Sequence, residues 1–394
     1  MNALTSAPGA ARLFAVSLVA RLPIAMLGIG LLVHTELATH SYAAAGLVSG
    51  AFALAQGVGG PLLGRIVDRR GQTLVLVLSS VVAALALAAT SALPDAMPLE
   101  ARVVLALIAG AAMPPVGACL RTLFATLTTD KQALRSAFAT DAAAVELTWV
   151  FGPPLVLWIG TLVSTGAALA TAGFVLAIAT LTFAGTGVSR RWRPEPRTHA
   201  HGAMRAPGMR TLTAVLTAVG LVFGAVEVSV AASAEHFGAE GSAGPLLALW
   251  GIGSLIGGLV AARLGGGART GNGLVLLLVA LAVGHLVLAA AGSPLALGAL
   301  IVLAGSTIAP TFATVYAMVD TVAPRGTATE AFAWLATAAA VGASAGAAVG
   351  GAVVDAAGPS SAFVFAGAAA VVAAVTAALR TRTLPTAEPS LATV

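Results

Sequence analysis

The sequence predicts an all-α membrane protein whose twelve transmembrane helices form two pseudo-symmetric six-helix bundles. Its composition excludes a soluble globular protein, because 58% of the 394 residues are hydrophobic and only 9% are charged, against about 25% charged residues in soluble domains. Apolar runs repeatedly reach the ~20 residues that a helix needs to cross the hydrocarbon layer. One long polar segment near the middle separates six such runs from six others.

Each apolar run is expected to be a helix, because lipid cannot hydrogen-bond an open backbone, and prolines within the runs are expected to act as kinks. The first run is too long for a signal-peptide core and has no small-residue cleavage site, so we expect it to be retained. The predicted spans are 13–35, 43–64, 73–93, 102–124, 137–160, 167–187, 211–233, 243–263, 273–292, 295–317, 327–353 and 360–380.

The polar connection between the sixth and seventh spans defines the predicted domains. Residues 1–188 form an N-terminal bundle, 189–210 a cytoplasmic linker, and 211–394 a C-terminal bundle with a short cytoplasmic tail. The halves resemble each other, since Gly59-Gly60 before Arg65 recurs as Gly257-Gly258 before Arg263, and the stretch 110–115 has a counterpart in 305–310. Parallel repeats of this kind place a substrate site near the midplane, between the halves.

The basic residues predict the orientation of the chain. All 20 Lys and Arg residues except Arg21 and Arg102 fall at one side of the predicted membrane, and an excess of basic residues marks the cytoplasmic side. We therefore expect both termini in the cytoplasm. The arginines lie in short loops rather than on a soluble patch, so no nucleic-acid partner is expected. The single cysteine, Cys119, excludes an intrachain disulfide and a multi-cysteine metal site.

The loop after the second span contains a cluster of charged residues. Gly60 and Gly64 are four residues apart, so one face of the helix offers small residues to a neighbouring helix. Asp68 and Arg69 follow, and Gly71 is placed to end the helix. A tight charged turn of this kind between two apolar helices marks a membrane surface.

These residues carry a resemblance to the major facilitator superfamily of secondary transporters, which covers the whole chain. The superfamily pattern in this loop is G-x-x-x-D-R/K-x-G-R/K-R/K, and Gly64, Asp68, Arg69 and Gly71 match it, whereas Gln72 and Thr73 replace the last two basic residues. Stretches 114–118, 152–156 and 326–332 resemble a bacterial efflux-type group. The resemblance implies a transporter of the bacterial plasma (inner) membrane.

Asp68 is the residue of this loop that we expect to act as a cytoplasmic gate. Its carboxylate is placed to meet the positive N-terminal end of the eleventh helix, near 327–330, or to pair with Arg121 at the inner end of the fourth span. Either contact would form only while the cytoplasmic side is closed, and would bias the equilibrium between two states. For Arg70 a role in setting topology is the simpler interpretation.

Five ionisable residues fall within spans: Arg21, Asp141, Glu146, Glu227 and His285. Such groups cost about 2.5–3.5 kcal/mol on insertion scales and are functional candidates until they are paired. Arg21 and Glu146 both lie roughly 14 Å into their predicted helices, so an Arg21–Glu146 ion pair is the leading expectation. Asp141 and Glu146 lie about 140° apart around one helix, and Asp141 is expected to be a structural partner near the cytoplasmic mouth.

Two of the five remain open between alternatives. Glu227 lies in the outer half of the seventh span, where it either takes up protons or sits as an ordinary residue at the mouth. His285 lies on the ninth span, which the resemblance implies is peripheral, and a structural role is favoured despite its suitable titration range.

Other candidates are a kink and a set of aromatic rings. Gly152-Pro153 resembles the antiporter motif of the fifth helix, without its usual continuation, and predicts a bend and close packing against the other half. Trp149, Trp250, Phe312, Tyr316 and Trp334 are candidate cavity aromatics suited to a ring-bearing substrate, with core packing as the alternative for each.

The predicted function is proton-coupled antiport, and hence efflux, of a small organic molecule by alternating access. The alternatives are a proton-coupled importer and a non-transporting membrane receptor or assembly protein. We do not expect an enzyme, because the residues within the spans form neither a nucleophile–base set nor a metal-ligand spacing. No phosphate-binding glycine loop with Lys is present, so nothing suggests that ATP drives transport. The expected partners are the substrate, protons and the lipid bilayer, and no metal or cofactor is expected. We expect a monomer.

Overall fold

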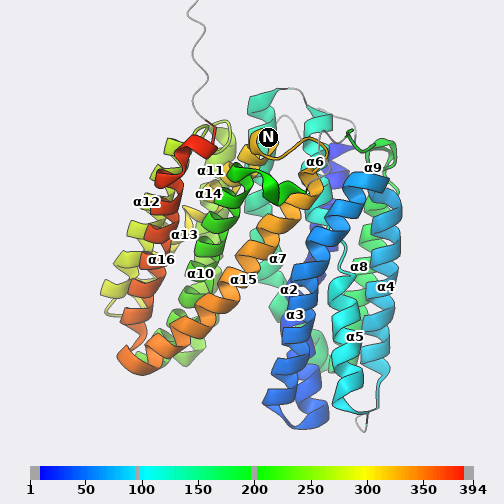
Figure 1. Ribbon diagram of the computed structural model, residues 1–394. Helices are drawn as coiled ribbons and strands as arrows, with labels where there is room; N and C mark the ends of the chain where they lie inside the picture. Colours follow the sequence, from blue (N-terminus) through cyan, green and yellow to red (C-terminus); the bar gives the residue numbers. More distant parts are fainter. Residues whose placement is uncertain (1–8, 95–96, 129, 197–201, 386–394) are drawn as a thin grey trace, which may run out of the picture.

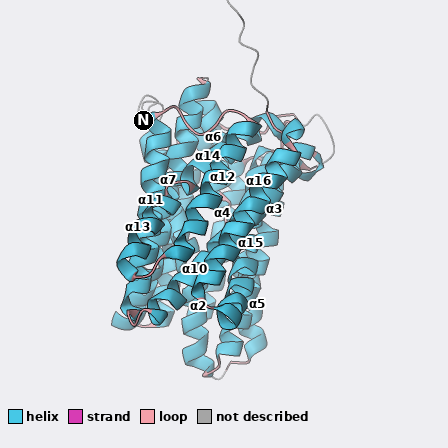
Figure 2. Cartoon of the chain, turned by 90° about the vertical axis from the view of Figure 1, so that its left-hand side faces the viewer, coloured by secondary structure: helices cyan, strands magenta, loops and turns pink. Residues whose placement is uncertain are grey.

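The computed structural model describes residues 9–94, 97–128, 130–196 and 202–385, in which every regular element is a helix (Figure 2). Twelve helical segments of this part are long and apolar enough to cross a membrane. The first half contains α2 (Ala10–Thr39), α3 (Tyr42–Arg70), α4 (Gln72–Ala92), α5 (Leu99–Ala111), α6 (Val116–Leu127), α7 (Lys131–Leu162), α8 (Thr165–Ala184) and α9 (Gly187–Arg191). The second contains η1 (Ala203–Arg205), α10 (Pro207–His236), η2 (Glu240–Ser242), α11 (Ala243–Arg263), α12 (Gly271–Val287), η3 (Leu288–Ala290), α13 (Pro294–Gly305), α14 (Ile308–Val322), α15 (Ala328–Ala357), α16 (Pro359–Leu379) and η4 (Thr381–Thr383).

Two of the twelve spans are interrupted near their middle. The fourth is broken between α5 and α6, where Pro114 and Pro115 lack the backbone N–H that would continue the helix. The tenth is broken between α13 and α14, just before Pro310. Pro153 and Pro154 lie inside the continuous α7. The two breaks fall at equivalent places in the two halves.

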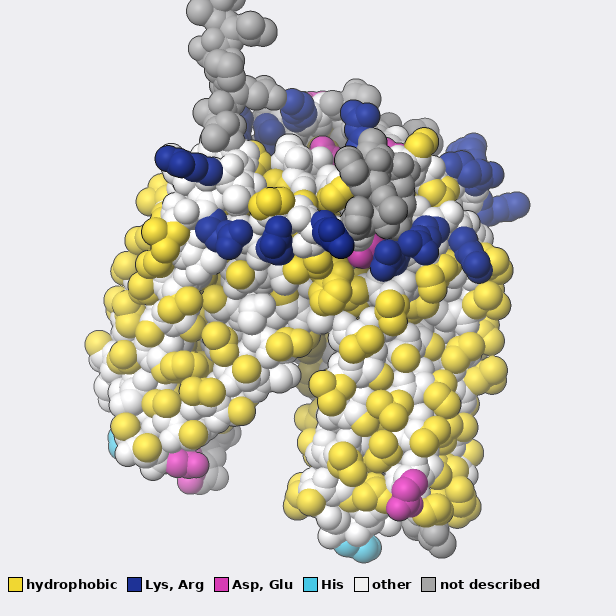
Figure 3. All heavy atoms as spheres, viewed as in Figure 1, with side chains coloured by type: hydrophobic (Ala, Val, Ile, Leu, Met, Phe, Trp, Pro, Cys, Tyr) yellow, Lys and Arg dark blue, Asp and Glu magenta, His cyan; other side chains and the backbone are white. Residues whose placement is uncertain are grey.

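The bundles pack closely at one end and diverge at the other (Figure 1). Figure 3 shows the space between them as a notch that is open away from a band of Lys and Arg side chains. We call the end that carries this band the basic face. Its arginines include Arg65, Arg69, Arg70, Arg190, Arg191, Arg193, Arg205, Arg210, Arg263, Arg269, Arg325, Arg380 and Arg382. Across the bundles, α3 and α6 pack on α15, while α7 packs on α11 and α14.

Glycines allow the closest helix approaches, and they do so at matching places in both halves. A Cβ atom on Gly59 would collide with the backbone of Ala111, and one on Gly257 would collide with the backbone of Ser306. Likewise, Gly110 lies against the Phe52 carbonyl group in the first half. These contacts give the internal repeat of the sequence a structural basis, because equivalent helices cross at equivalent glycines.

We predict that Gly59→Ala lowers the thermal stability of the purified protein, because the added methyl group meets backbone that cannot move aside, and overpacking of this kind costs about 1–3 kcal/mol. The neighbouring Gly60 provides a matched control, since a Cβ atom there would meet nothing within 4 Å. Gly60→Ala should leave the unfolding midpoint unchanged or slightly higher. Equal midpoints for the two variants would contradict the assigned helix crossing.

Candidate functional site

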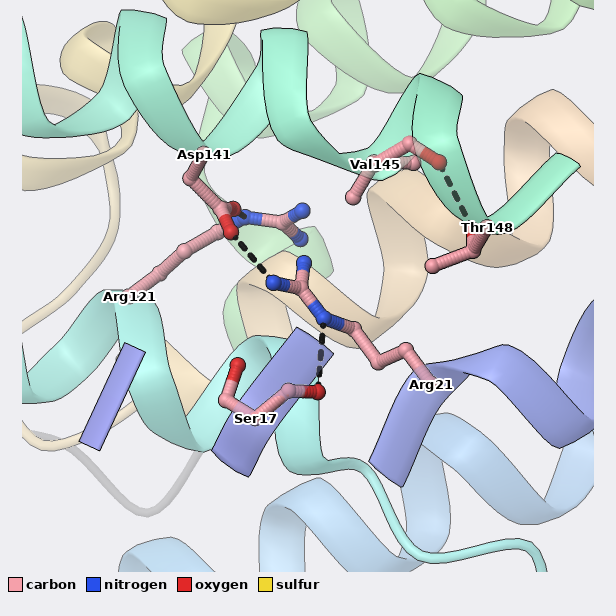
Figure 4. A network of polar contacts seen from close by, with 6 residues as sticks. All are labelled: Ser17, Arg21, Arg121, Asp141, Val145 and Thr148. Carbon is pink, nitrogen blue, oxygen red and sulfur yellow. Dashed lines mark hydrogen bonds and ion pairs between the residues drawn. The ribbon is translucent and has the colours of Figure 1, made fainter. Parts of the chain in front are cut away.

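A buried cluster of three charged residues lies where α2, α6 and α7 meet (Figure 4). Arg21 Nη2 is 2.7 Å from Asp141 Oδ1, and Arg121 Nε donates a hydrogen bond of 2.9 Å to Asp141 Oδ2. Arg21 Nε also donates to the Ser17 carbonyl group at 3.2 Å. The three side chains are 7%, 7% and 0% exposed. We call Arg21, Arg121 and Asp141 the buried triad.

The expected Arg21–Glu146 pair is wrong, since the partner of Arg21 is Asp141. Helix α7 begins at Lys131, six residues before the predicted span, and α2 begins at Ala10. Arg21 and Asp141 therefore both lie about 15 Å from the basic ends of their helices, at 1.5 Å per residue. The alternative partner considered for Asp68, Arg121, also binds Asp141 instead.

The triad has two cations and one anion, so its charge is not balanced from within. In Figure 4 the guanidinium groups of Arg21 and Arg121 converge on one carboxylate, which comes from α7. The Tyr316 ring on α14 covers the Arg121 guanidinium group, whose Cζ lies 3.8 Å from the ring centroid. A cation over an aromatic ring is stabilised further when both are shielded from water. This contact joins the first bundle to the second.

Glu146 faces away from the triad and contacts the other bundle. The Ser254 hydroxyl group of α11 donates a hydrogen bond of 2.8 Å to Glu146 Oε1. Glu146 has no ion pair with any described Lys or Arg residue, in contrast to Asp141. Ser254 was not among the residues predicted from the sequence, where a single serine in an apolar span carries no distinguishing signal. The two acids of α7 thus serve different interfaces, as their angular separation requires.

Aromatic rings form a continuous series in the second bundle. Phe312 stacks on Phe223 at a centroid distance of 5.8 Å and lies 5.8 Å from Tyr316. Trp250 packs edge-on against Phe223 at 5.2 Å. Of the predicted cavity aromatics, Phe312, Tyr316 and Trp250 therefore lie together.

The two remaining candidate aromatics lie elsewhere. Trp149, on α7, is 55% exposed. Trp334 lines a pocket at the basic face together with Arg65 and Arg205. Its expected place in a central cavity is wrong, because Trp334 stands one turn beyond Glu330 in the second turn of α15, close to the basic end of that helix.

Asp68 caps a helix of the opposite bundle. Its Oδ1 accepts a hydrogen bond from the Thr329 N–H at 3.1 Å, and its Oδ2 accepts one from the Glu330 N–H at 2.8 Å. Helix α15 has no side-chain cap from its own N-cap residue, Thr327. Asp68 therefore supplies in trans the acceptor that a helix N-terminus needs. Of the two contacts considered for Asp68, the one with the eleventh span is present.

The other residues of the loop motif surround this cap. A Cβ atom on Gly64 would lie 2.9 Å from the Thr329 carbonyl oxygen, so Gly64 is the small residue that admits α15, whereas Gly60 faces no neighbour. Gly71 ends α3 with a φ of 92°, a conformation that glycine adopts readily. Arg69 is exposed beside Asp68 at the end of α3.

Three further candidates are placed as follows. Glu227 is exposed on α10, and no hydrogen bond or ion pair holds it within the described residues. His285 is fully buried on α12, with Nδ1 2.7 Å from the Leu281 carbonyl oxygen. Gly152, beside Pro153, packs on Ala25 of α2 in its own bundle. The expected packing of Gly152 against the other half is wrong, because the glycine face of α7 is turned away from α11.

We predict that Asp141→Asn destabilises the protein more than Arg121→Gln does. The first change leaves two buried guanidinium groups without a counter-charge, and breaking a buried ion pair in this way costs about 3–5 kcal/mol. The second leaves one balanced Arg21–Asp141 pair. Thermal unfolding of the purified variants measures the difference, and a smaller loss for Asp141→Asn would contradict the charge assignment of the triad.

Comparison with known proteins addresses the family of the chain. The sequence model of the Major Facilitator Superfamily matches residues 13–272 and 212–393. No curated protein sequence matches the chain.

Solved structures share the fold at low sequence identity. The human organic anion transporter MFSD10 (TETRAN) is 16% identical over 93% of this chain and 99% of its own, with a TM-score of 0.69. A single-residue variant of the E. coli fucose:proton symporter FucP is 15% identical over 93% of this chain and 98% of its own, with a TM-score of 0.69. FucP in the outward conformation is 16% identical over 93% of this chain and 98% of its own, with a TM-score of 0.69. Because the family model matches most of its length, the chain belongs to the major facilitator superfamily and is a multi-pass membrane transporter of the secondary type.

Proposed function

We propose that the protein is a proton-coupled antiporter that exports a small organic molecule by alternating access. The observation that carries the proposal is the hydrogen bond between Glu146 and Ser254. It joins a titratable side chain of one bundle to the other bundle, at a contact that has to separate when the basic face opens. Protonation of Glu146 is thereby tied to the conformational equilibrium.

Glu146 suits this role better than Asp141 does. Two arginines neutralise Asp141 permanently, whereas Glu146 is held by one hydroxyl group. An ionised carboxylate within a membrane is costly unless it is paired or hydrated. The surroundings of Glu146 differ between the two conformations of the transporter. Each conformation therefore favours a different protonation state of Glu146.

The orientation of the chain sets the direction of proton movement. An excess of basic residues marks the cytoplasmic side, so we assign the basic face and both chain ends to the cytoplasm of a bacterial plasma membrane. The notch then opens outward (Figure 3), a conformation also named for one of the similar FucP structures. In this outward-open state protons reach the site from outside, and they are released on the cytoplasmic side in the opposite state. The inward flow of protons down their gradient drives export of the substrate.

The substrate class follows from the rings of the second bundle. Phe223, Phe312 and Trp250 offer stacked and edge-on faces between α10, α11 and α14, which suit an apolar ring. The two relatives named above are described as an organic anion transporter and a fucose:proton symporter. Both descriptions support a small organic substrate, and the second supports coupling to protons.

We predict that Glu146→Gln abolishes the pH dependence of transport. The amide keeps a hydrogen bond to Ser254 but cannot carry a proton. The measurement is uptake of a panel of ring-bearing compounds into inverted membrane vesicles under an imposed pH gradient. Asp320→Asn, which changes an exposed acid of α14, is the matched control and should leave the pH dependence intact. If Glu146→Gln retained normal pH coupling, the residue would be removed from the proton pathway, and accumulation in the opposite direction would support an importer.

We predict that Asp68→Asn strongly reduces transport while membrane insertion stays normal. The amide oxygen can accept only one of the two backbone hydrogen bonds now made by the carboxylate, and it loses the charge that favours a helix N-terminus. One hydrogen bond and the favourable charge at the helix N-terminus together contribute about 1–2 kcal/mol, and their loss shifts the equilibrium away from the state closed at the basic face. Arg70→Gln, in the same loop but exposed, should transport normally. Normal transport by Asp68→Asn would refute the gate.

A further inference from the structure

A pocket of about 370 Å³ lies at the basic face, where the two bundles and the linker meet. Arg65 of α3 forms one wall, and Trp334 of α15 forms another. Arg205 of η1 and Arg210 of the first turn of α10 complete the basic lining. The pocket is therefore built from both halves of the chain, and none of the roles discussed above uses it.

The charges in this pocket favour an anion. Three arginines, Arg65, Arg205 and Arg210, line the pocket together with one acid, Glu330. Glu330 Oε1 accepts a hydrogen bond from the Ala203 N–H at 3.3 Å, and its Oε2 lies 4.0 Å from Arg65 Nε. A net charge of two positive units thus remains. Planar guanidinium groups match the geometry of phosphate oxygens and bind them bidentately.

The surroundings indicate that the anion belongs to a lipid rather than to a free solute. On α3, an exposed apolar row formed by Val58, Leu62 and Ile66, which are 64%, 55% and 40% exposed, leads directly to Arg65. Trp334 adds an apolar wall to the pocket itself. In Figure 3 the basic side chains follow the border of the apolar surface, which is the level of lipid headgroups. A phospholipid whose phosphate occupied the pocket would have its acyl chains beside this row.

We propose that this pocket binds the phosphate of an anionic phospholipid, and that the bound lipid stabilises the state closed at the basic face. Arg65 belongs to the first bundle, whereas Arg210 and Trp334 belong to the second. One phosphate held by both would link the bundles only while α3 and α15 are in contact. A ligand that binds one of two states shifts the equilibrium toward that state. The inference does not depend on the transported solute or on its direction.

The chain provides a matched control pocket of about 300 Å³ at the same face. It is also lined by three arginines and a tryptophan, which are Arg70, Arg190, Arg193 and Trp192. All four belong to the first half of the chain, where Arg70 ends α3 and the other three lie in α9 or directly after it. A phosphate bound there would not link α3 to α15. A comparison of variants of the two pockets therefore distinguishes general attraction of a lipid to a basic surface from a specific link between the bundles.

The first experiment measures lipid binding to the full-length protein in detergent by native mass spectrometry. We expect phosphatidylglycerol to bind more tightly than phosphatidylcholine with the same acyl chains. Because a hydrogen bond to a charged group contributes about one tenfold step in affinity or more, Arg65→Gln and Arg205→Gln should each weaken the tightest phosphatidylglycerol site about tenfold. Arg190→Gln should leave that site unchanged. Inorganic phosphate alone should compete only weakly.

The second experiment measures the conformational equilibrium in phosphatidylcholine nanodiscs with and without phosphatidylglycerol. Spin labels at Tyr42→Cys and Leu295→Cys, which are 76% and 86% exposed at the open ends of different bundles, report the width of the notch in a Cys119→Ala background. Phosphatidylglycerol should increase the wide-notch population. Arg65→Gln should remove this response, and Arg190→Gln should keep it.

Three results would overturn the proposal. Equal binding of phosphatidylglycerol and phosphatidylcholine would remove the anion preference. Displacement of the lipid by millimolar inorganic phosphate would assign the pocket to a free anion. Equal effects of Arg190→Gln and Arg65→Gln would reduce the response to general surface charge. Arg205→Gln provides an independent check if Arg65→Gln is poorly produced, because Arg205 is an exposed residue of the linker.

Discussion

The interaction on which the first bundle depends is the sharing of one carboxylate by two guanidinium groups. Asp141 is fully buried, and the helices that carry Arg21 and Arg121 converge on it. In a membrane neither arginine has water as an alternative partner, so α2, α6 and α7 cannot separate without exposing an unpaired charge to an apolar medium. The triad thereby holds these three helices together, which suits a bundle that moves against another one.

The contacts between the bundles have a different character. At one junction, Asp68 of α3 completes the N-terminus of α15 through two backbone N–H groups. At a second junction, Glu146 of α7 meets a single hydroxyl group on α11. Each contributes on the order of 1 kcal/mol, as helix caps and single hydrogen bonds do. Strong interactions thus lie within the first bundle and weak ones between bundles, so the bundles separate before either one deforms.

Much of the fold was predictable, because it follows from one-dimensional features. Apolar length located the spans, and Gly71 was recognised as a helix end from its place after a charged turn. The repeat of Gly59 as Gly257 also appears as equivalent helix crossings. These features depend only on residues that are close in the sequence and on the length of helix needed to cross a membrane.

The details of the site were less predictable, because they depend on which helix each face meets. The pairing of Arg21 with Asp141 rests on the start of α7 at Lys131, where the N-cap Asp130 accepts hydrogen bonds from two N–H groups. The apolar run begins six residues after the start of this helix, and an error of six residues moves a side chain by more than one turn. Trp334 has a different cause, since the start of its helix was predicted to within one residue, and its place in the second turn of α15 already puts it near the basic face. Nothing in the sequence distinguished Ser254 from other serines within spans.

The contact between Arg121 and Tyr316 connects the interactions within the first bundle to those between the bundles. Arg121 is fixed by Asp141 within the first bundle, while Tyr316 belongs to the aromatic series of the second. When the bundles part at the basic face, the ring has to leave the guanidinium group, and such contacts are worth about 0.5–2 kcal/mol. The charge left on Arg121 then faces the space between the bundles. The excess positive charge of the triad is therefore covered in the closed state and uncovered in the open one, which makes the attraction of the site for an anionic group dependent on conformation.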